Sequence, residues 1–120
     1  MDYLTLVAAG IMTLTVFVHV FMGGPEIMRP VHATQMPKVV AAVMDVIWHG
    51  ITVTLAVIAA ALFWLSWQPN APLLITISAI QLGFAGLFLW YGLTRLGSLW
   101  PMPQWVVFLG VPALCLWASV

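Results

Sequence analysis

Residues 38–67 read KVVAAVMDVIWHGITVTLAVIAAALFWLSW, and this stretch decides the fold. It holds two charged residues, Lys38 at its start and Asp45 seven residues later. About 20 apolar residues in a helix cross the hydrocarbon core of a bilayer. Because lipid offers no partners for open backbone groups, an apolar run of this length predicts a transmembrane helix.

Three further apolar segments flank this run, at about residues 3–22, 73–95 and 104–119. The breaks between the segments contain Pro together with Gly or Asn, the residues that commonly separate helices. The sequence therefore predicts an all-α fold, a polytopic four-helix transmembrane bundle in a single domain covering residues 1–120.

The composition excludes a water-soluble domain. Of the 120 residues, 64% are hydrophobic and 5% are charged, whereas a soluble domain carries roughly 25% charged residues. The net charge is zero, so nothing points to nucleic acid. Cys115 is the single cysteine, which rules out a disulfide framework. We expect an integral protein of a bacterial inner membrane, with the lipid bilayer as its first partner.

The cations predict the orientation. Arg29 and Lys38 lie in the first connection and Arg95 lies beside the third, while the second connection has no charge. Positively charged residues favour the cytoplasmic side. Connections one and three are therefore expected in the cytoplasm, with both termini on the non-cytoplasmic side.

Small residues predict the surfaces on which the helices pack. They recur at helical spacing in the second and third segments, where they would let two helices approach closely. We expect these faces to pack inside the bundle; the residues are Ala56, Ala60, Ala79, Gly83 and Gly86.

The most informative polar residues are Asp45 and His49. An Asp at the centre of a membrane helix costs about 2.5–3.5 kcal/mol, so its presence requires a reason. The two residues are spaced i,i+4, which places them on one helix face. By helical rise they lie roughly 10 and 16 Å beyond Lys38. The pattern predicts that they face protein, either as a hydrogen-bonded pair or as part of a site.

Other polar residues are expected to gather nearby. His19 lies close to the inner end of the first segment, and the connection that follows carries Glu26, Arg29 and His32. Gln81, in the third segment, could add an amide. The candidate binding residues are thus His19, Glu26, His32, Asp45 and His49, with Arg29 and Gln81 as supporting polar groups.

This set of side chains is compatible with several chemistries. Histidine and carboxylate together bind divalent transition metals. A His/Asp pair buried in a bundle can also relay protons. Haem is disfavoured, because His19 and His49 differ in depth by roughly 11 Å and opposed axial ligands need similar depth. The polar pair could instead serve only to lock the bundle.

His19, Gly23, Gly24 and Pro30 form a pattern of a helix that ends in His, followed by Gly-Gly and a later Pro. In this pattern the first quarter of the chain resembles CopD-like copper-resistance proteins and related small four-helix bacterial membrane proteins. The resemblance implies metal handling near His19.

Three functions follow from these observations. The first is a small membrane protein whose His/carboxylate cluster binds a metal ion or cofactor, as a homo-oligomer or as part of a larger membrane complex. The second is a non-catalytic accessory subunit, and the third is a proton-coupled transporter or channel acting as an oligomer. No nucleophile–base pair or phosphate-binding loop appears, which disfavours an enzyme and leaves no catalytic residue to name.

Overall fold

The computed structural model describes all 120 residues, and every regular element is a helix. Its elements combine into four continuous helices. The first comprises α1 (Tyr3–Val18), η1 (His19–Met28) and α2 (Arg29–Ala33); the second is α3 (Lys38–Leu65); the third joins α4 (Ala71–Tyr91) to η2 (Gly92–Leu96); and the fourth is α5 (Trp105–Ala118). The first three are long and apolar enough to cross a membrane, and α5 is apolar but shorter.

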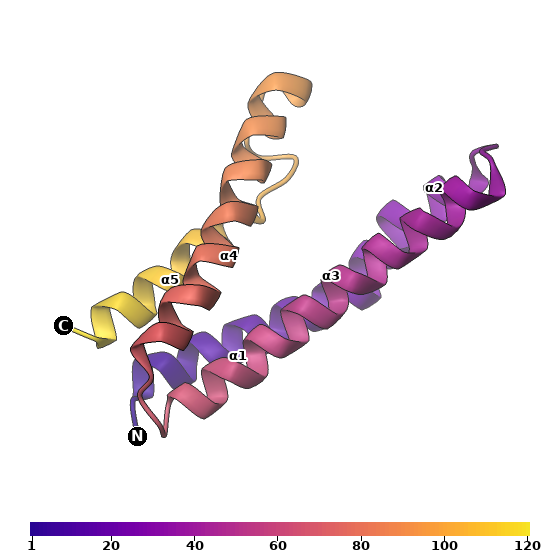
Figure 1. The fold of residues 1–120 in the computed structure, drawn as a ribbon. Coiled ribbons are helices and arrows are strands. Elements are labelled where there is room, and N and C mark those ends of the chain that lie inside the picture. The colour runs from indigo at the N-terminus through magenta and orange to yellow at the C-terminus, as the bar shows by residue number, and fades with distance from the viewer.

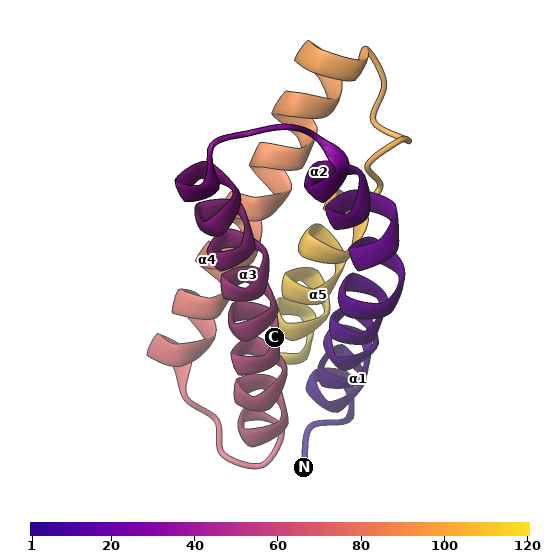
Figure 2. The same cartoon turned by 90° about the vertical axis from the view of Figure 1, so that its right-hand side faces the viewer.

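The helices form two hairpins that diverge like a V (Figure 1). The first helix lies along α3, and α4 lies along α5, while α1 also contacts α5. The apex of the V holds the N-terminus and the connection from α3 to α4 (Figure 1). The connection from α2 to α3 lies at the far end of the first hairpin (Figure 2).

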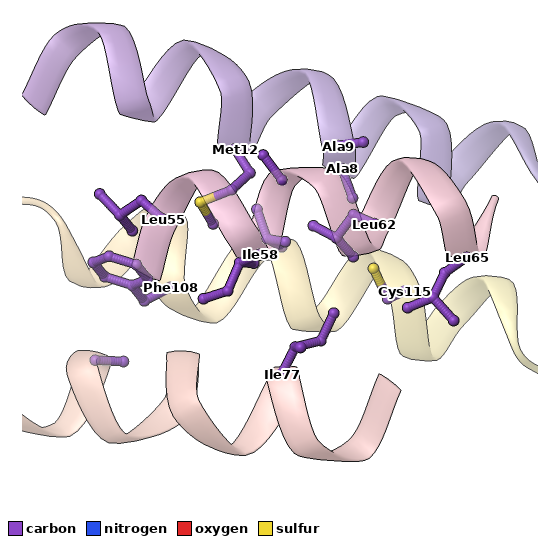
Figure 3. Packing of buried hydrophobic residues seen from close by; sticks show 13 residues of the cluster. Ala8, Ala9, Met12, Leu55, Ile58, Leu62, Leu65, Ile77, Phe108 and Cys115 are labelled. Carbon is purple, nitrogen blue, oxygen red and sulfur yellow. The ribbon is translucent and has the colours of Figure 1, made fainter. Parts of the chain in front are cut away.

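The hydrophobic core lies between α1, α3, α4 and α5 (Figure 3). It joins the first half of α1, the second half of α3, α4 and α5 through residues that include Ala8, Met12, Leu55, Leu62 and Phe108. The rest of the first hairpin extends past this core. In η1, α2 and residues 38–54 of α3, which we call the distal arm, Met28 is the one buried residue.

Side chains and a glycine define the helix ends. The Asp2 carboxylate caps α1 by accepting hydrogen bonds from the N–H groups of Leu4 and Thr5, and the Asp2 N–H donates to the Ser66 carbonyl at 2.8 Å. Asn70 caps α4 in the same way. Gly97 ends η2 with φ +66°, a left-handed conformation that glycine adopts without steric cost.

The first helix does not end near Met22 as the sequence predicts; it continues through Gly23, Gly24 and Pro25 to Ala33. Proline normally breaks a helix because it lacks an N–H and its ring clashes with the carbonyl four residues earlier. Here the helix widens to π-type i→i+5 bonding over His19–Met28. Pro25 has no N–H to donate in the wider turn either, but the helix continues through it without a break.

The prediction that the small residues of α3 and α4 pack inside the bundle is wrong for the single chain. All five are exposed: Ala56, Ala60, Ala79, Gly83 and Gly86. The core faces of α3 and α4 carry larger residues such as Ile58 and Ile77. Close approach between α1 and α3 comes instead from Ala8 and Ala9 on α1. The small residues on α1 leave room for the larger side chains of α3.

The Asp2 cap gives a testable pH dependence. The Thr5 hydroxyl donates to the Asp2 carboxylate at 2.5 Å and holds the pKa of Asp2 below its usual value of 3.8. A carboxyl whose pKa is lowered by folding stabilises the fold above its unfolded pKa, and this contribution is lost as pH falls through the folded pKa. Asp2→Ala should lower the unfolding free energy by about 1 kcal/mol at pH 7.

Asp2→Asn is the matched control, since Asn caps helices about as well and does not titrate. Thermal unfolding in detergent should show the gap between wild type and Asp2→Asn narrowing or reversing between pH 5 and pH 3, in a range set by the usual Asp pKa of about 3.9. A gap that stays constant over this range would contradict the assigned role of the carboxylate.

Candidate functional site

The polar residues that the sequence singles out lie mostly in the distal arm, where apolar packing is sparse. Two contacts cross from the first helix to α3 there, one made by His32 and one by His19. Each joins a side chain of the first helix to a residue about two or three turns into α3. They are the side-chain hydrogen bonds that link the two helices of the arm.

His32 and Asp45 make the outer contact. The Nε2 atom of His32 lies 2.6 Å from Oδ1 of Asp45, and their side chains are 53% and 44% exposed. This pairing corrects the prediction that Asp45 pairs with His49. The expected loop is in fact helix α2, and its extra turns carry His32 alongside the first part of α3.

His19 and Trp48 make the inner contact. Their rings stack with centroids 4.0 Å apart and an angle of 20° between the planes. The Nε2 atom of His19 also lies 3.3 Å from the Trp48 carbonyl, so a tautomer with hydrogen on Nε2 would donate to it. Sequence reasoning missed Trp48. The available signal was a tryptophan far inside a membrane segment, whereas tryptophans of membrane proteins concentrate at the two interfaces.

Gly23 provides the space that the Trp48 indole occupies. A Cβ atom added at Gly23 would lie 2.9 Å from Cη2 of Trp48, closer than real side chains pack. At Gly24 the same atom would meet nothing within 4 Å. His19 and Gly23 therefore hold one indole between them, and the first glycine of the pair has a packing role that the second lacks.

The remaining candidate residues do not join these contacts. His49 is exposed on α3 and has no hydrogen-bond partner in the chain. Glu26 and Arg29 are exposed and form no ion pair. Gln81 is buried in α4, where its amide nitrogen donates to the Ile77 carbonyl at 3.2 Å and its oxygen has no partner.

The five residues predicted to form one cluster are thus separate: His32 pairs with Asp45, His19 packs on Trp48, which is outside the predicted set, and Glu26 and His49 have no partner. Nowhere do three or more His, Cys, Asp or Glu side chains gather in a way that could hold a metal ion. What the arrangement does is mechanical: it holds two helices together where few apolar side chains are buried between them. We call the contacts His32–Asp45 and His19–Trp48, together with Gly23, the polar clasp.

Comparison with protein families, with curated proteins and with solved structures finds no match to this chain.

The two glycines give a matched test of the clasp. Gly23→Ala forces the Trp48 indole to move, and overpacking of this kind costs about 1–3 kcal/mol. Gly24→Ala places a methyl group in open space and gains helix propensity, so it should leave stability unchanged or slightly raised. Thermal unfolding in detergent measures both. Equal effects of the two substitutions would contradict the packing of Gly23 on Trp48.

Loss of the outer contact should loosen α2 specifically. Asp45→Ala leaves His32 without its partner, and a half-exposed polar contact of this kind is worth up to about 1 kcal/mol. Hydrogen exchange of the α2 amides, at Arg29–Ala33, should accelerate about fivefold. Glu26→Ala, which removes an exposed carboxylate with no partner, should leave exchange unchanged. His32→Ala should match Asp45→Ala, and unequal effects would show that Asp45 has another role.

Proposed function

We propose that this protein is a non-catalytic integral membrane subunit, a clasped pair of helical hairpins that serves as an accessory part of a larger membrane complex. The observation that carries the proposal is the use of the polar side chains. His19, His32 and Asp45 each bridge the first helix and α3, so the groups that could have formed a reaction centre are engaged in holding helices together.

The proposal includes a polytopic arrangement in a bacterial inner membrane with both termini on the non-cytoplasmic side. The distribution of Arg29, Lys38 and Arg95 supports this orientation. The V-shaped fold agrees with it, because the end that carries Arg29 and Lys38 lies opposite the apex that carries the N-terminus (Figures 1 and 2).

The outer faces of α3 and α4 are the surfaces proposed to contact neighbouring helices. Ala56 and Ala60 are exposed on one, and Gly83 and Gly86 on the other. Hydrophobic burial does not drive association in lipid, so close packing on small residues has to supply it. His49 lies roughly two turns before Ala56 on the same side of α3, where a neighbouring helix would offer it the hydrogen-bond partner that lipid cannot.

Metal or cofactor binding is the second candidate, and the free His49 favours it. An imidazole without an intrachain partner could serve as one ligand of a site completed by a neighbour. The resemblance of His19, Gly23 and Gly24 to CopD-like proteins points the same way, although His19 and Gly23 are already packed on Trp48.

Site-specific photo-crosslinking in the native membrane tests the accessory role. A photoreactive residue at Ala56 should give discrete crosslinks to another membrane polypeptide, because it lies on the proposed contact face. A probe at Ile47 is the control, since it is also exposed but lies nearly opposite His49 on the helix. Equal crosslinking from both positions, or none from Ala56, would contradict a specific contact.

Elemental analysis of the purified protein separates the second candidate from the first. The accessory role predicts no stoichiometric metal in wild type or in His49→Ala. Near-stoichiometric metal in wild type that is lost in His49→Ala, with crosslinking at Ala56 unchanged, would support metal binding instead. A crosslink between two copies of this chain would assign the contact to a homo-oligomer.

A further inference from the structure

The turn between α2 and α3 encloses an open cavity of about 580 Å³ at the end of the distal arm. Its lining mixes polar and apolar side chains, and the polar ones are His32, Thr34, Gln35 and Lys38. No carboxylate lines it, and the nearby Asp45 is bonded to His32. The cavity is therefore a pocket of mixed lining that holds one unpaired positive charge, in a chain that has six charged residues.

Lys38 and Gln35 are free to bind a ligand there. Neither side chain makes a hydrogen bond or ion pair within the chain, whereas the Thr34 hydroxyl donates to the Pro30 carbonyl at 3.1 Å. Lys38 supplies a compact ammonium donor, and Gln35 supplies an amide N–H₂ group. The first N–H groups of α3 add to the same local field, because Pro37 at the helix start offers no side-chain cap. All of these groups favour an anion.

The pocket lies at the level that lipid headgroups occupy. The helix of residues 3–33 and α3 extend about 46 and 42 Å at 1.5 Å per residue, whereas the hydrocarbon core is about 30 Å thick. Both helices therefore extend well past the apolar layer. Most of the polar residues of the first hairpin lie toward its distal end. The turn at residues 34–37 therefore falls among the lipid headgroups.

We infer that this pocket binds the phosphate of an anionic membrane lipid, with Lys38 and Gln35 as the principal contacts and Thr34 at the rim. The apolar part of the lining suits the glycerol and the first carbons of the acyl chains, since Val31, Met36 and Ala41 form it. Basic pockets between transmembrane helices are known to hold anionic headgroups. The site is independent of the proposed accessory role and of His49.

Native mass spectrometry of the full chain in detergent tests this inference with phosphatidylglycerol, with phosphatidylcholine and with inorganic phosphate. We expect one phosphatidylglycerol to bind more tightly than phosphatidylcholine. Lys38→Gln should weaken this binding about fivefold, the effect of one basic residue near an anionic membrane surface. Gln35→Ala should weaken it less, and the thermal midpoint of both variants should stay near that of wild type because the two residues are exposed.

Arg95→Gln is the matched control. Arg95 carries the same charge at the end of η2, where its guanidinium lies 5.9 Å from the centre of the Tyr91 ring and outside the pocket. Its loss should leave the tight lipid site unchanged. Equal weakening by Arg95→Gln and Lys38→Gln would reduce the effect to diffuse surface charge and overturn the inference. Binding of inorganic phosphate as tight as that of phosphatidylglycerol would assign the pocket to a soluble anion and overturn the lipid assignment.

Discussion

The stacking of His19 on Trp48 is the contact on which the distal arm depends. The hydrophobic core holds the helices together near the apex of the V, and almost nothing apolar is buried beyond it. Apolar side chains gain little by exchanging contact with lipid tails for contact with another helix, so they do not draw two helices together. An aromatic stack supported by a hydrogen bond to a backbone carbonyl, and a glycine beneath the indole, give a specific attraction there instead.

The helical content was predictable because composition and run length leave no alternative in lipid. The number of helices followed from the three Pro-containing breaks, at 23–37, 68–72 and 97–104. The break at Gly23–Pro25 misled the same reasoning, since Gly and Pro there do not end the helix but widen it. Propensity rules describe a regular α-helix, and they do not anticipate a π-type turn through which the helix continues past a proline.

The site was harder to predict than the fold. Depth and spacing singled out His19 and Asp45, and the polar first connection added His32, but spacing within one helix paired Asp45 with His49. The actual partner lies 13 residues away, and it reaches Asp45 only because the helix continues to Ala33. Because the end of the first helix was predicted wrongly, the partner of Asp45 was predicted wrongly too. Gly23 and Trp48 could not have been paired from sequence, because their contact depends on the register between two helices.

One explanation, contact with a neighbouring helix, accounts for both the exposed small residues and the free His49 once the polar clasp is assigned. In a single chain the clasp satisfies His19, His32 and Asp45, whereas His49 faces outward on α3 with Ala56 and Ala60. A polar group in an apolar layer without a partner is costly, and small residues beside it permit a second helix to come close. The polar residues of α3 therefore differ in their partners: Asp45 and Trp48 contact the first helix and close the hairpin, whereas the exposed His49, one turn beyond Asp45, is left for whatever packs against it.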